Sequence, residues 1–269
     1  MTAVVAVVAH PDDESLIAGG TLALAARAGT VVGAVSLTRG EQGPIAAPEL
    51  ATRETLGDVR QAELHAAGEA LGASFTACLR HPDGELEWVD HERAADELAA
   101  LLGPREPAAV LTFGSDGLYG HPDHVATREI TGMALDRLET GSANQVCLYE
   151  SVWPQGLVTG LVAAARESGL ATDLWGLEPA AFGSREAVAT LVVDTRSTLD
   201  RKLRALRAHR SQLGSAHLLR ALPDDLAERF LRRELWRLAR PSRSDGGALA
   251  ALLGEWASVA AAPGLGAGG

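Results

Sequence analysis

Two His-Pro-Asp clusters, each following a run of apolar residues, constrain this chain most strongly. The first cluster reads Ala-His-Pro-Asp-Asp-Glu over residues 9–14 and directly follows the apolar run 4–8. The second reads Tyr-Gly-His-Pro-Asp-His over residues 119–124 and comes soon after the apolar run 108–113. Adjacent carboxylates at the end of a buried strand repel each other and lose water, so they destabilise a fold unless a cation lies between them. The pattern therefore predicts buried strands that end in a metal site.

Apolar runs alternate with helical patterns along the first 150 residues. Strands are predicted at 4–8, 31–37, 75–79, 108–113 and 146–150, and helices at 21–28, 52–71, 94–102 and 127–138. This alternation favours a parallel sheet, and continuous apolar strands are typical of a sheet that is buried on both faces. We therefore expect an α/β fold with a Rossmann-like, mainly parallel sheet and helices on both faces. Its active site should lie at the carboxyl ends of the strands.

The second half of the chain is less regular. It contains a predicted strand at 191–193 and predicted helices at 198–210 and 225–238. The basic residues of the first of these helices are interpreted as a solvated face: Arg201, Lys202, Arg204 and Arg207. With 269 residues, one domain over 1–245 is expected, and the Ala- and Gly-rich segment 246–269 is expected to form a C-terminal tail with mobile last residues.

The composition excludes several classes of partner. The net charge of −11 argues against nucleic acid and anionic membrane surfaces, because both favour basic proteins. No apolar run approaches the roughly 18 residues needed to span a bilayer, and no basic segment precedes 4–8 as in a signal peptide. Cys78 and Cys147 are isolated, which predicts no disulfide. We therefore expect a cytoplasmic protein without stable membrane insertion, for which a homo-oligomer is compatible with the sequence.

Both clusters carry side chains that bind metals. His10 and Asp13 are three residues apart, as are His121 and His124, so a turn would place each pair on one side. Imidazole and carboxylate suit zinc, and three such ligands leave one position open for catalysis. Spacing alone does not decide between His121 and His124 as the ligand. The simpler reading, in which each cluster is a turn whose Asp caps a helix, is weakened because the pattern occurs twice.

The paired motifs resemble those of the zinc-dependent LmbE/PIG-L family. Its members include N-acetylglucosaminyl-phosphatidylinositol de-N-acetylases and the deacetylases of mycothiol and bacillithiol synthesis. Further matches lie in the loop 38–41 (Thr-Arg-Gly-Glu), in an Arg-x-x-Glu helix and in a later Lys…His-x-x-Gln helix, and comprise Arg60, Glu63, Lys202, His209 and Gln212. The similarity therefore runs from about residue 3 to about residue 215.

The resemblance implies one Zn²⁺ per chain, with Fe²⁺ as an alternative. It implies that His10, Asp13 and His124 bind the metal and that Asp12 is the general base. Zinc lowers the pKa of a bound water, and a carboxylate that is not a ligand can accept the proton of that water.

The resemblance also assigns the side chains around the developing oxyanion. His121 would carry the charge there, oriented by Asp123, and Tyr119 would assist the same oxyanion. The residues expected to contact substrate follow strand ends or face the same crevice: Arg39, Glu41 and Arg60. An alternative is that Arg60 pairs with Glu63 or another local acid.

The activity implied by the resemblance is removal of the N-acetyl group from a GlcNAc-containing small molecule, which releases acetate and a free amino sugar. One alternative is a mycothiol S-conjugate amidase. Those relatives use a lysine soon after the first motif, and residues 15–18 (Ser-Leu-Ile-Ala) supply none. Another alternative is a non-catalytic sugar-binding module, against which the intact imidazoles and carboxylates argue.

Other side chains receive structural interpretations. Leu16 and Ile17 are expected to make the pocket mouth apolar. The remaining histidines are expected at exposed or turn positions: His65, His81, His91 and His217. Three tryptophans are interpreted as core or pocket wall: Trp153, Trp175 and Trp236.

Overall fold

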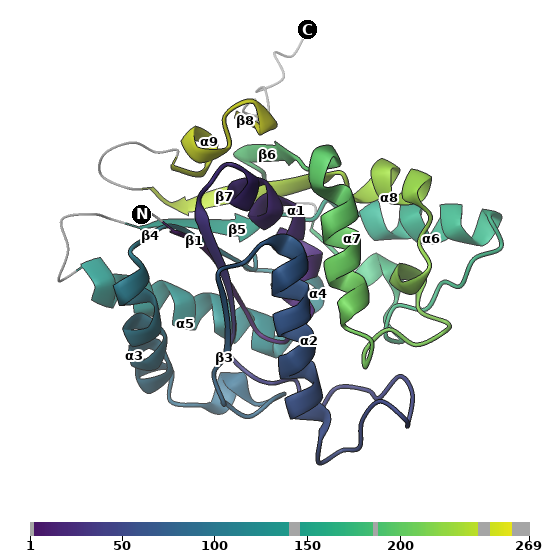
Figure 1. Cartoon of the computed structure of the whole chain (residues 1–269), viewed down its shortest axis with the longest axis horizontal. Coiled ribbons are helices and arrows are strands. Elements are labelled where there is room, and N and C mark those ends of the chain that lie inside the picture. The colour runs from purple at the N-terminus through teal and green to yellow at the C-terminus, as the bar shows by residue number, and fades with distance from the viewer. Residues whose placement is uncertain (1–2, 140–145, 185–187, 242–247, 260–269) are drawn as a thin grey trace, which may run out of the picture.

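The described part of the chain contains one eight-stranded mixed sheet. The computed structural model describes residues 3–139, 146–184, 188–241 and 248–259. The strand order is β3-β2-β1-β4-β5-β7-β6-β8 (Figure 1). The bounds are β1 Ala3–Val8, β2 Val31–Ser36, β3 Phe75–Cys78, β4 Pro107–Thr112, β5 Cys147–Ser151, β6 Leu191–Asp194, β7 Arg233–Arg240 and β8 Ala257–Val259. The first five strands pair in parallel, whereas β7 and β8 pair antiparallel with their neighbours.

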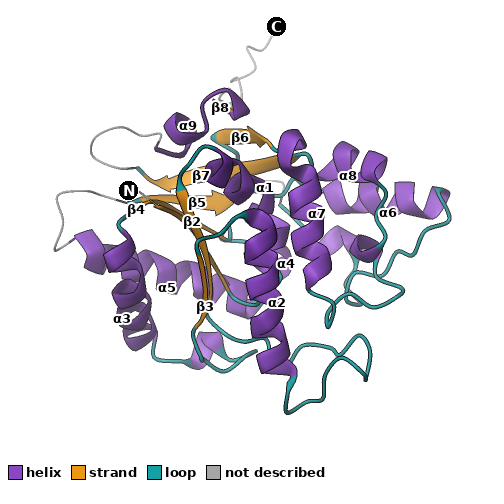
Figure 2. Cartoon of the chain, viewed as in Figure 1, coloured by secondary structure: helices purple, strands orange, loops and turns teal. Residues whose placement is uncertain are grey.

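Helices cover both faces of the sheet, as Figure 2 shows. Their bounds are α1 Asp13–Arg27, α2 Leu56–Leu71, α3 His91–Leu102, α4 Gly117–Gly120, α5 Pro122–Glu139, α6 Leu157–Glu167, α7 Leu199–Ala208, α8 Asp224–Leu231 and α9 Ala248–Leu253. Helices α3 and α5 pack together on one side, and α2 packs with α7, which also contacts α1, on the other. This arrangement confirms the predicted α/β fold. None of the described helices is long and apolar enough to span a bilayer.

The central position of β1 explains its composition. Every residue of β1 is fully buried, and the strand pairs with β2 on one side and with β4 on the other. Valine and alanine fill such a strand because neither of its faces meets water. Because β1 and β4 are parallel neighbours, the two His-Pro-Asp clusters that follow them emerge at the same edge of the sheet. The topology therefore brings together segments that lie about a hundred residues apart.

The predicted helix 225–238 is wrong in its second half. Helix α8 ends at Leu231, and β7 then runs antiparallel between β5 and β6. Glu234 and Trp236 are buried at alternate positions, which is a strand pattern. The strand forms because its backbone pairs with segments distant in sequence, and helical periodicity in a short window does not reveal such pairing.

Part of the expected C-terminal tail belongs to the fold. Leu249 and Leu253 of α9 are buried, and β8 pairs antiparallel with β6. The segment 246–269 is therefore not simply a tail, because residues 248–259 add a helix and the edge strand of the sheet. The Gly-rich end 264–269, expected to be mobile, lies outside the described residues.

Helix α1 begins eight residues before the predicted start at 21. Asp13 and Glu14 occupy its first turn, where negative charge interacts favourably with the helix dipole. Gly19 and Gly20 lie inside this helix. A Cβ on Gly20 would meet the side chain of Thr195 at 2.4 Å. Gly20 is therefore a site of close packing.

The helix predicted at 198–210 does not present a wholly solvated basic face. Lys202 of α7 is buried, and its Nζ lies 2.7 Å from Glu234 Oε1. The Glu234 carboxylate also accepts the backbone N–H groups of Gly20 and Thr21, at 2.8 and 2.7 Å. This buried ion pair therefore joins α1, α7 and β7.

Candidate active site and metal centre

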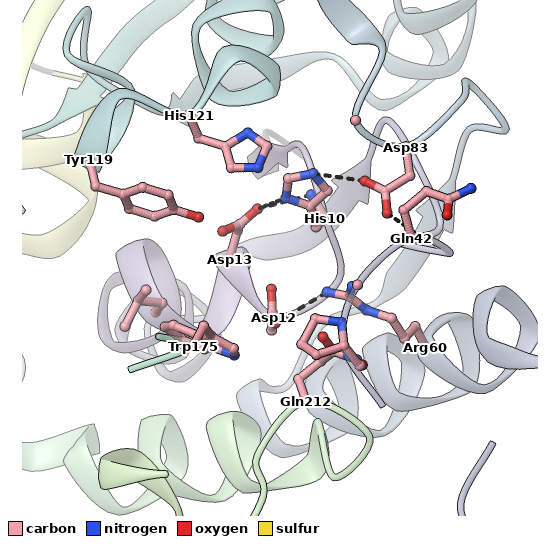
Figure 3. A pocket seen from close by; sticks show the side chains of 14 residues that line it. His10, Asp12, Asp13, Gln42, Arg60, Asp83, Tyr119, His121, Trp175 and Gln212 are labelled. Atoms are coloured by element: carbon pink, nitrogen blue, oxygen red, sulfur yellow. Dashed lines mark hydrogen bonds and ion pairs between the residues drawn. The ribbon is translucent and has the colours of Figure 1, made fainter. Parts of the chain in front are cut away.

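A cavity of about 220 Å³ opens at the carboxyl ends of the parallel strands (Figure 3). It contains both polar and apolar side chains. The polar and charged side chains are His10, Asp12, Asp13, Gln42, Arg60, Asp83, His121 and Gln212. The apolar and aromatic side chains are Leu16, Pro44, Tyr119 and Trp175. The cavity therefore brings together residues from seven separate stretches of the chain.

His10, Asp13 and His124 converge in the manner that a metal ion requires. Their ligand atoms all lie within 4.8 Å of one another. His10 Nδ1 is 3.3 Å from one oxygen of Asp13, and His124 Nε2 is 3.4 Å from the other. Two imidazoles and one carboxylate form a common catalytic ligand set for a divalent metal, with room for a further ligand. The three residues that the resemblance implies as ligands therefore lie close enough to share one ion.

The surroundings of His124 fit a metal ligand. Its Nδ1 lies 3.0 Å from the carbonyl oxygen of Gly117, so Nδ1 carries the proton and Nε2 keeps its lone pair. That Nε2 is buried and has no hydrogen-bond partner among the described residues. Phe113 stacks on the ring at 3.9 Å between centroids and fixes its plane. A buried nitrogen without a partner, aimed at a carboxylate, is expected where a cation binds.

Two carboxylates hold the opposite edge of His10. Its Nε2 lies 3.1 Å from Asp83 Oδ1 and 3.2 Å from Asp123 Oδ2. Burial disfavours protonation, but hydrogen bonds to Asp123, Asp13 and Asp83 outweigh it and hold the pKa of His10 well above its usual value. Metal-binding histidines commonly donate their second N–H to a carboxylate in this way.

Asp83 was not predicted from the sequence, although a signal was present. Residues 81–83 read His-Pro-Asp, a third copy of the tripeptide, and they follow β3 as the other copies follow β1 and β4. Asp83 also accepts the backbone N–H of Gln42 at 2.7 Å, which fixes the loop after β2. The repeated tripeptide, read together with the strand that precedes it, would have identified this residue.

Asp12 lies beside the candidate metal ligands and is not one of them. Its backbone has a φ of 123°, which is rare for a residue other than glycine and costs about 1–3 kcal/mol. Arg60 holds this conformation by donating to the Pro11 carbonyl at 2.6 Å and to Asp12 Oδ2 at 3.2 Å. Burial raises the pKa of Asp12 to about 6, although Arg60 acts in the opposite direction. A carboxyl with such a pKa is suited to proton transfer near neutral pH.

A buried ion pair supports the strained backbone of Asp12 from behind. Glu14 Oε2 accepts the Asp12 N–H at 3.0 Å, and Glu14 Oε1 lies 2.8 Å from His209 Nε2. Both side chains are completely buried. Burial opposes ionisation of each, but their mutual attraction prevails, so the pKa of Glu14 is lowered and that of His209 is raised. His209, whose role the sequence left open, thus connects the end of α7 to Asp12.

His121 and Tyr119 lie on the opposite side of the cavity from Arg60 (Figure 3). Burial lowers the pKa of His121 to about 4, and the charge of the nearby His10 acts in the same direction. The lowered pKa favours the neutral form of His121, whereas the resemblance implies a protonated imidazole, and a bound cation would add to this repulsion. Burial raises the pKa of Tyr119 far above its usual value, so its hydroxyl keeps its proton.

The carboxylate of Asp123, expected to orient His121, makes its hydrogen bonds with other groups. The carboxylate contacts His10 instead and accepts the backbone N–H groups of Gly84 and Leu86, at 2.8 and 3.0 Å. Only the backbone N–H of Asp123 reaches His121, at 3.1 Å from Nδ1. The three groups that the carboxylate meets come from the segments after β1 and β3, so their approach depends on the sheet rather than on local sequence.

Of the three expected substrate contacts, Arg60 lines the cavity and the other two have different roles. Arg39 pairs with Asp58 at 2.8 Å, in an exposed position. Glu41 accepts the backbone N–H of Asp83 at 3.2 Å and so supports the cavity loop from outside. Arg60 pairs with Asp12 rather than with Glu63, which is the local acid proposed as its alternative partner.

Some structural interpretations also need correction. His217 is buried rather than exposed, and its ring lies 4.3 Å from that of Trp175 between centroids. Leu16 lines the cavity as expected, whereas Ile17 is buried and does not. Trp175 is a cavity wall and Trp236 is core, which agrees with their interpretation.

The chain is similar to known proteins in sequence and in fold. Residues 5–135 match the profile of the PIG-L family, described as GlcNAc-PI de-N-acetylase. Two relatives are named 1D-myo-inositol 2-acetamido-2-deoxy-alpha-D-glucopyranoside deacetylase. The one from Acidothermus cellulolyticus is 32% identical and covers 86% of this chain and 87% of the relative. The one from Actinosynnema mirum is 36% identical and covers 86% and 89%.

Solved structures extend the likeness to the fold. An N,N'-diacetylchitobiose deacetylase from Pyrococcus horikoshii is 19% identical, with a TM-score of 0.60 and coverage of 88% of this chain and 83% of that one. A 4-carboxy-2-hydroxymuconate hydratase from Pseudomonas putida is 20% identical, also with a TM-score of 0.60, and covers 90% and 97%. Since these two proteins have different activities, this fold alone does not identify a reaction. The sequence identity to the curated relatives does identify the family: the chain belongs to the PIG-L/LmbE family.

Proposed function

We propose that this protein is a metal-dependent amide hydrolase that removes the N-acetyl group from a GlcNAc-containing small molecule. The observation that carries the proposal is the arrangement of Asp12 and Asp13. Asp13 faces two imidazoles in a ligand set, whereas Asp12, the next residue, faces the cavity with a pKa of about 6. One carboxylate is thus available to bind a cation and the other to move a proton.

The names of the relatives support a specific substrate class. Both curated relatives described above are deacetylases of an N-acetylglucosaminide of inositol. We infer a substrate of the same kind, an N-acetylglucosamine joined to a small polar group. A cytoplasmic location is proposed with it, because the free Cys78 and Cys147 suit a reducing compartment.

We propose that His10, Asp13 and His124 hold the metal and that the metal is zinc. When bound, such an ion polarises a carbonyl oxygen and lowers the pKa of water. Asp12 then accepts the proton of the attacking water and delivers it to the amide nitrogen as the C–N bond breaks. Arg60 keeps the Asp12 carboxylate in place through its contacts with Asp12 and Pro11.

The opposite wall of the cavity would stabilise the charge that develops on the acyl oxygen. Tyr119 offers a hydroxyl that remains protonated, and His121, whose Nδ1 accepts the backbone N–H of Asp123, offers its Nε2–H as a donor. Removing one such donor typically reduces kcat about 10²–10³-fold.

The experiment that tests this function compares two neighbouring carboxylates. Asp12→Asn should lower kcat for acetate release from the N-acetylglucosaminide of inositol by about 10²–10⁴-fold, the usual contribution of a general base. Its zinc content, measured by atomic emission, should remain at the wild-type level. Asp13→Asn should instead lose zinc.

A wild-type protein that binds zinc but releases no acetate from any N-acetylglucosaminide would contradict the proposal. Full activity of Asp12→Asn would contradict the proton-transfer role. Asp58→Asn is the control, because Asp58 is exposed and pairs only with Arg39 among the described residues. Both its activity and its metal content should equal those of the wild type.

A further inference from the structure

The lining of the reaction cavity divides into a polar side and an apolar side. Figure 3 places Gln42, Asp83 and Arg60 to one side of Asp12, and Tyr119 and Trp175 to the other. Hydroxyl groups of a sugar need hydrogen-bond partners when they are buried, so the pyranose belongs on the polar side. The apolar side then faces the acyl group.

A second, entirely apolar cavity lies behind the apolar side. Its volume is about 20 Å³, and its walls include Leu157, Val158 and Leu161 of α6 and Phe230 and Leu231 of α8. This space would hold about one water molecule, and it offers no polar partner to bind one. It is therefore a small dry chamber next to the site of reaction.

Leu16 and Trp175 separate the two cavities, because they line both. Leu16 projects from the first turns of α1, and Trp175 lies in the loop that follows α6. Trp175 has a φ of 53°, a left-handed conformation that is uncommon for any residue with a side chain. The loop holds this conformation through the Gly176 N–H, which donates to Asp173 Oδ1 at 3.0 Å, and the indole contacts the ring of His217.

The position of the scissile amide bond determines which part of the substrate contacts Leu16 and Trp175. The amide nitrogen must approach Asp12 to receive its proton, and the acyl oxygen must approach Tyr119 and His121. The remaining substituent of the carbonyl carbon is the alkyl group, which the apolar side of the cavity accommodates. In N-acetyl substrates this group is a methyl.

We propose that Leu16 and Trp175 set the length of the acyl group that the enzyme removes, and that the chamber behind them is a latent acyl-chain site. This inference rests on the proposed function and deepens it. A methyl group fits in front of the wall, whereas a longer chain meets the indole. Removing the indole joins the two cavities and gives the chain an apolar path.

The test uses glucosaminides that carry N-acetyl, N-butanoyl or N-hexanoyl groups. The wild type should prefer acetyl strongly, since each methylene that the pocket cannot place costs roughly 10-fold or more in kcat/KM. Trp175→Gly should raise the hexanoyl-to-acetyl ratio of kcat/KM at least 10-fold. Glycine is chosen because it adopts a φ of 53° without strain. Leu16→Ala should change the ratio in the same direction.

A filling variant serves as the matched control. Leu157 lines the chamber but not the reaction cavity, so Leu157→Phe alone should leave acetyl hydrolysis unchanged. Combined with Trp175→Gly, it should return the hexanoyl-to-acetyl ratio towards the wild-type value. A Trp175→Gly protein that keeps its zinc and its acetyl activity but shows an unchanged ratio would overturn the inference, and the proposed function would stand.

A binding measurement tests the wall independently of turnover. Calorimetry with Asp12→Asn and with Asp12→Asn/Trp175→Gly would compare N-acetyl- and N-hexanoylglucosaminides. The second protein should bind the hexanoyl compound at least 10-fold more tightly than the first does. Equal affinities would refute the acyl-chain site, whereas a wild type that releases no acetate would refute the proposed function.

Discussion

The adjacent carboxyl groups of Asp12 and Asp13 have pKa values that are shifted in opposite directions. Burial raises the pKa of Asp12 to about 6. Burial acts in the same sense on Asp13, but His124 and His10 outweigh it and hold the pKa of Asp13 well below its usual value. The difference arises because Asp13 contacts two imidazoles, whereas for Asp12 burial outweighs the opposing charge of Arg60. Such divergence between adjacent groups is a mark of a functional site.

At the same scale, Asp83 should contribute to metal affinity without touching the metal. It lies 3.1 Å from His10 Nε2, and partners of this kind typically contribute 10–100-fold to affinity. Because Asp123 contacts the same nitrogen, we expect Asp83→Asn to weaken zinc binding about 10-fold in a competition assay with a chelator. The exposed Arg39–Asp58 pair supplies the control variant, Asp58→Asn. Unchanged affinity in Asp83→Asn would show that Asp123 alone orients His10.

His217 should make the stability of the protein depend on pH. Burial lowers its pKa to about 4, and its Nδ1 accepts the backbone N–H of Leu219 at 3.2 Å, which protonation would break. The unfolded chain titrates near 6.5, so between these values it binds more protons than the folded chain does. The contribution is therefore fully present above pH 6.5 and is lost as the pH falls towards 4.

The corresponding measurement is urea unfolding of the wild type and of His217→Asn at pH 7 and pH 4.5. Between pH 7 and pH 4.5, the free energy of unfolding of the wild type should fall by about 2 kcal/mol more than that of the variant. Asparagine is used because its side-chain oxygen can accept the same N–H, two residues on. Parallel pH dependences in the two proteins would exclude His217 as the titrating group.

At the scale of elements, one ion pair joins parts of the chain that the sequence does not connect. Lys202 of α7 and Glu234 of β7 are both buried, and Glu234 also accepts two backbone N–H groups of α1. The pair therefore fixes how α1, which begins with Asp13, lies against the antiparallel part of the sheet.

Breaking this pair from one side should be strongly destabilising. Lys202→Ala leaves the charge of Glu234 buried without its partner, which typically costs about 3–5 kcal/mol of unfolding free energy. Arg204→Ala, two residues along the same helix, removes an exposed pair with Asp200 and should cost less than about 1 kcal/mol. Chemical denaturation of both variants checks the contrast, and equal effects would show that burial of the pair is irrelevant.

At the scale of the whole molecule, the parallel sheet brings the residues of the site together. Three consecutive parallel strands, β3, β2 and β1, and their neighbour β4 all end at the same edge. Three His-Pro-Asp tripeptides follow β1, β3 and β4, and each contributes at least one side chain around His10. The acidic cluster that is unfavourable in isolation thus becomes a shared support for one imidazole.

The sequence by itself determined the features that depend on short stretches of chain. These include the buried strands of the first half, the α/β class, the turn chemistry of His-Pro-Asp and the candidate ligands His10 and Asp13. Such features follow from periodicity and from the spacing of residues within one or two turns. The resemblance to the PIG-L/LmbE family favoured His124 over His121 as the third ligand and added Asp12 as the general base.

Only the tertiary structure decided the partners of each side chain. In the structure the Asp123 carboxylate contacts His10, and Arg60 pairs with Asp12. Lys202 and His217 are buried, and residues 233–240 form a strand. An apolar chamber lies behind Leu16 and Trp175. These outcomes depend on strand order and on packing between distant segments, whose free energies are not encoded in any local window of residues.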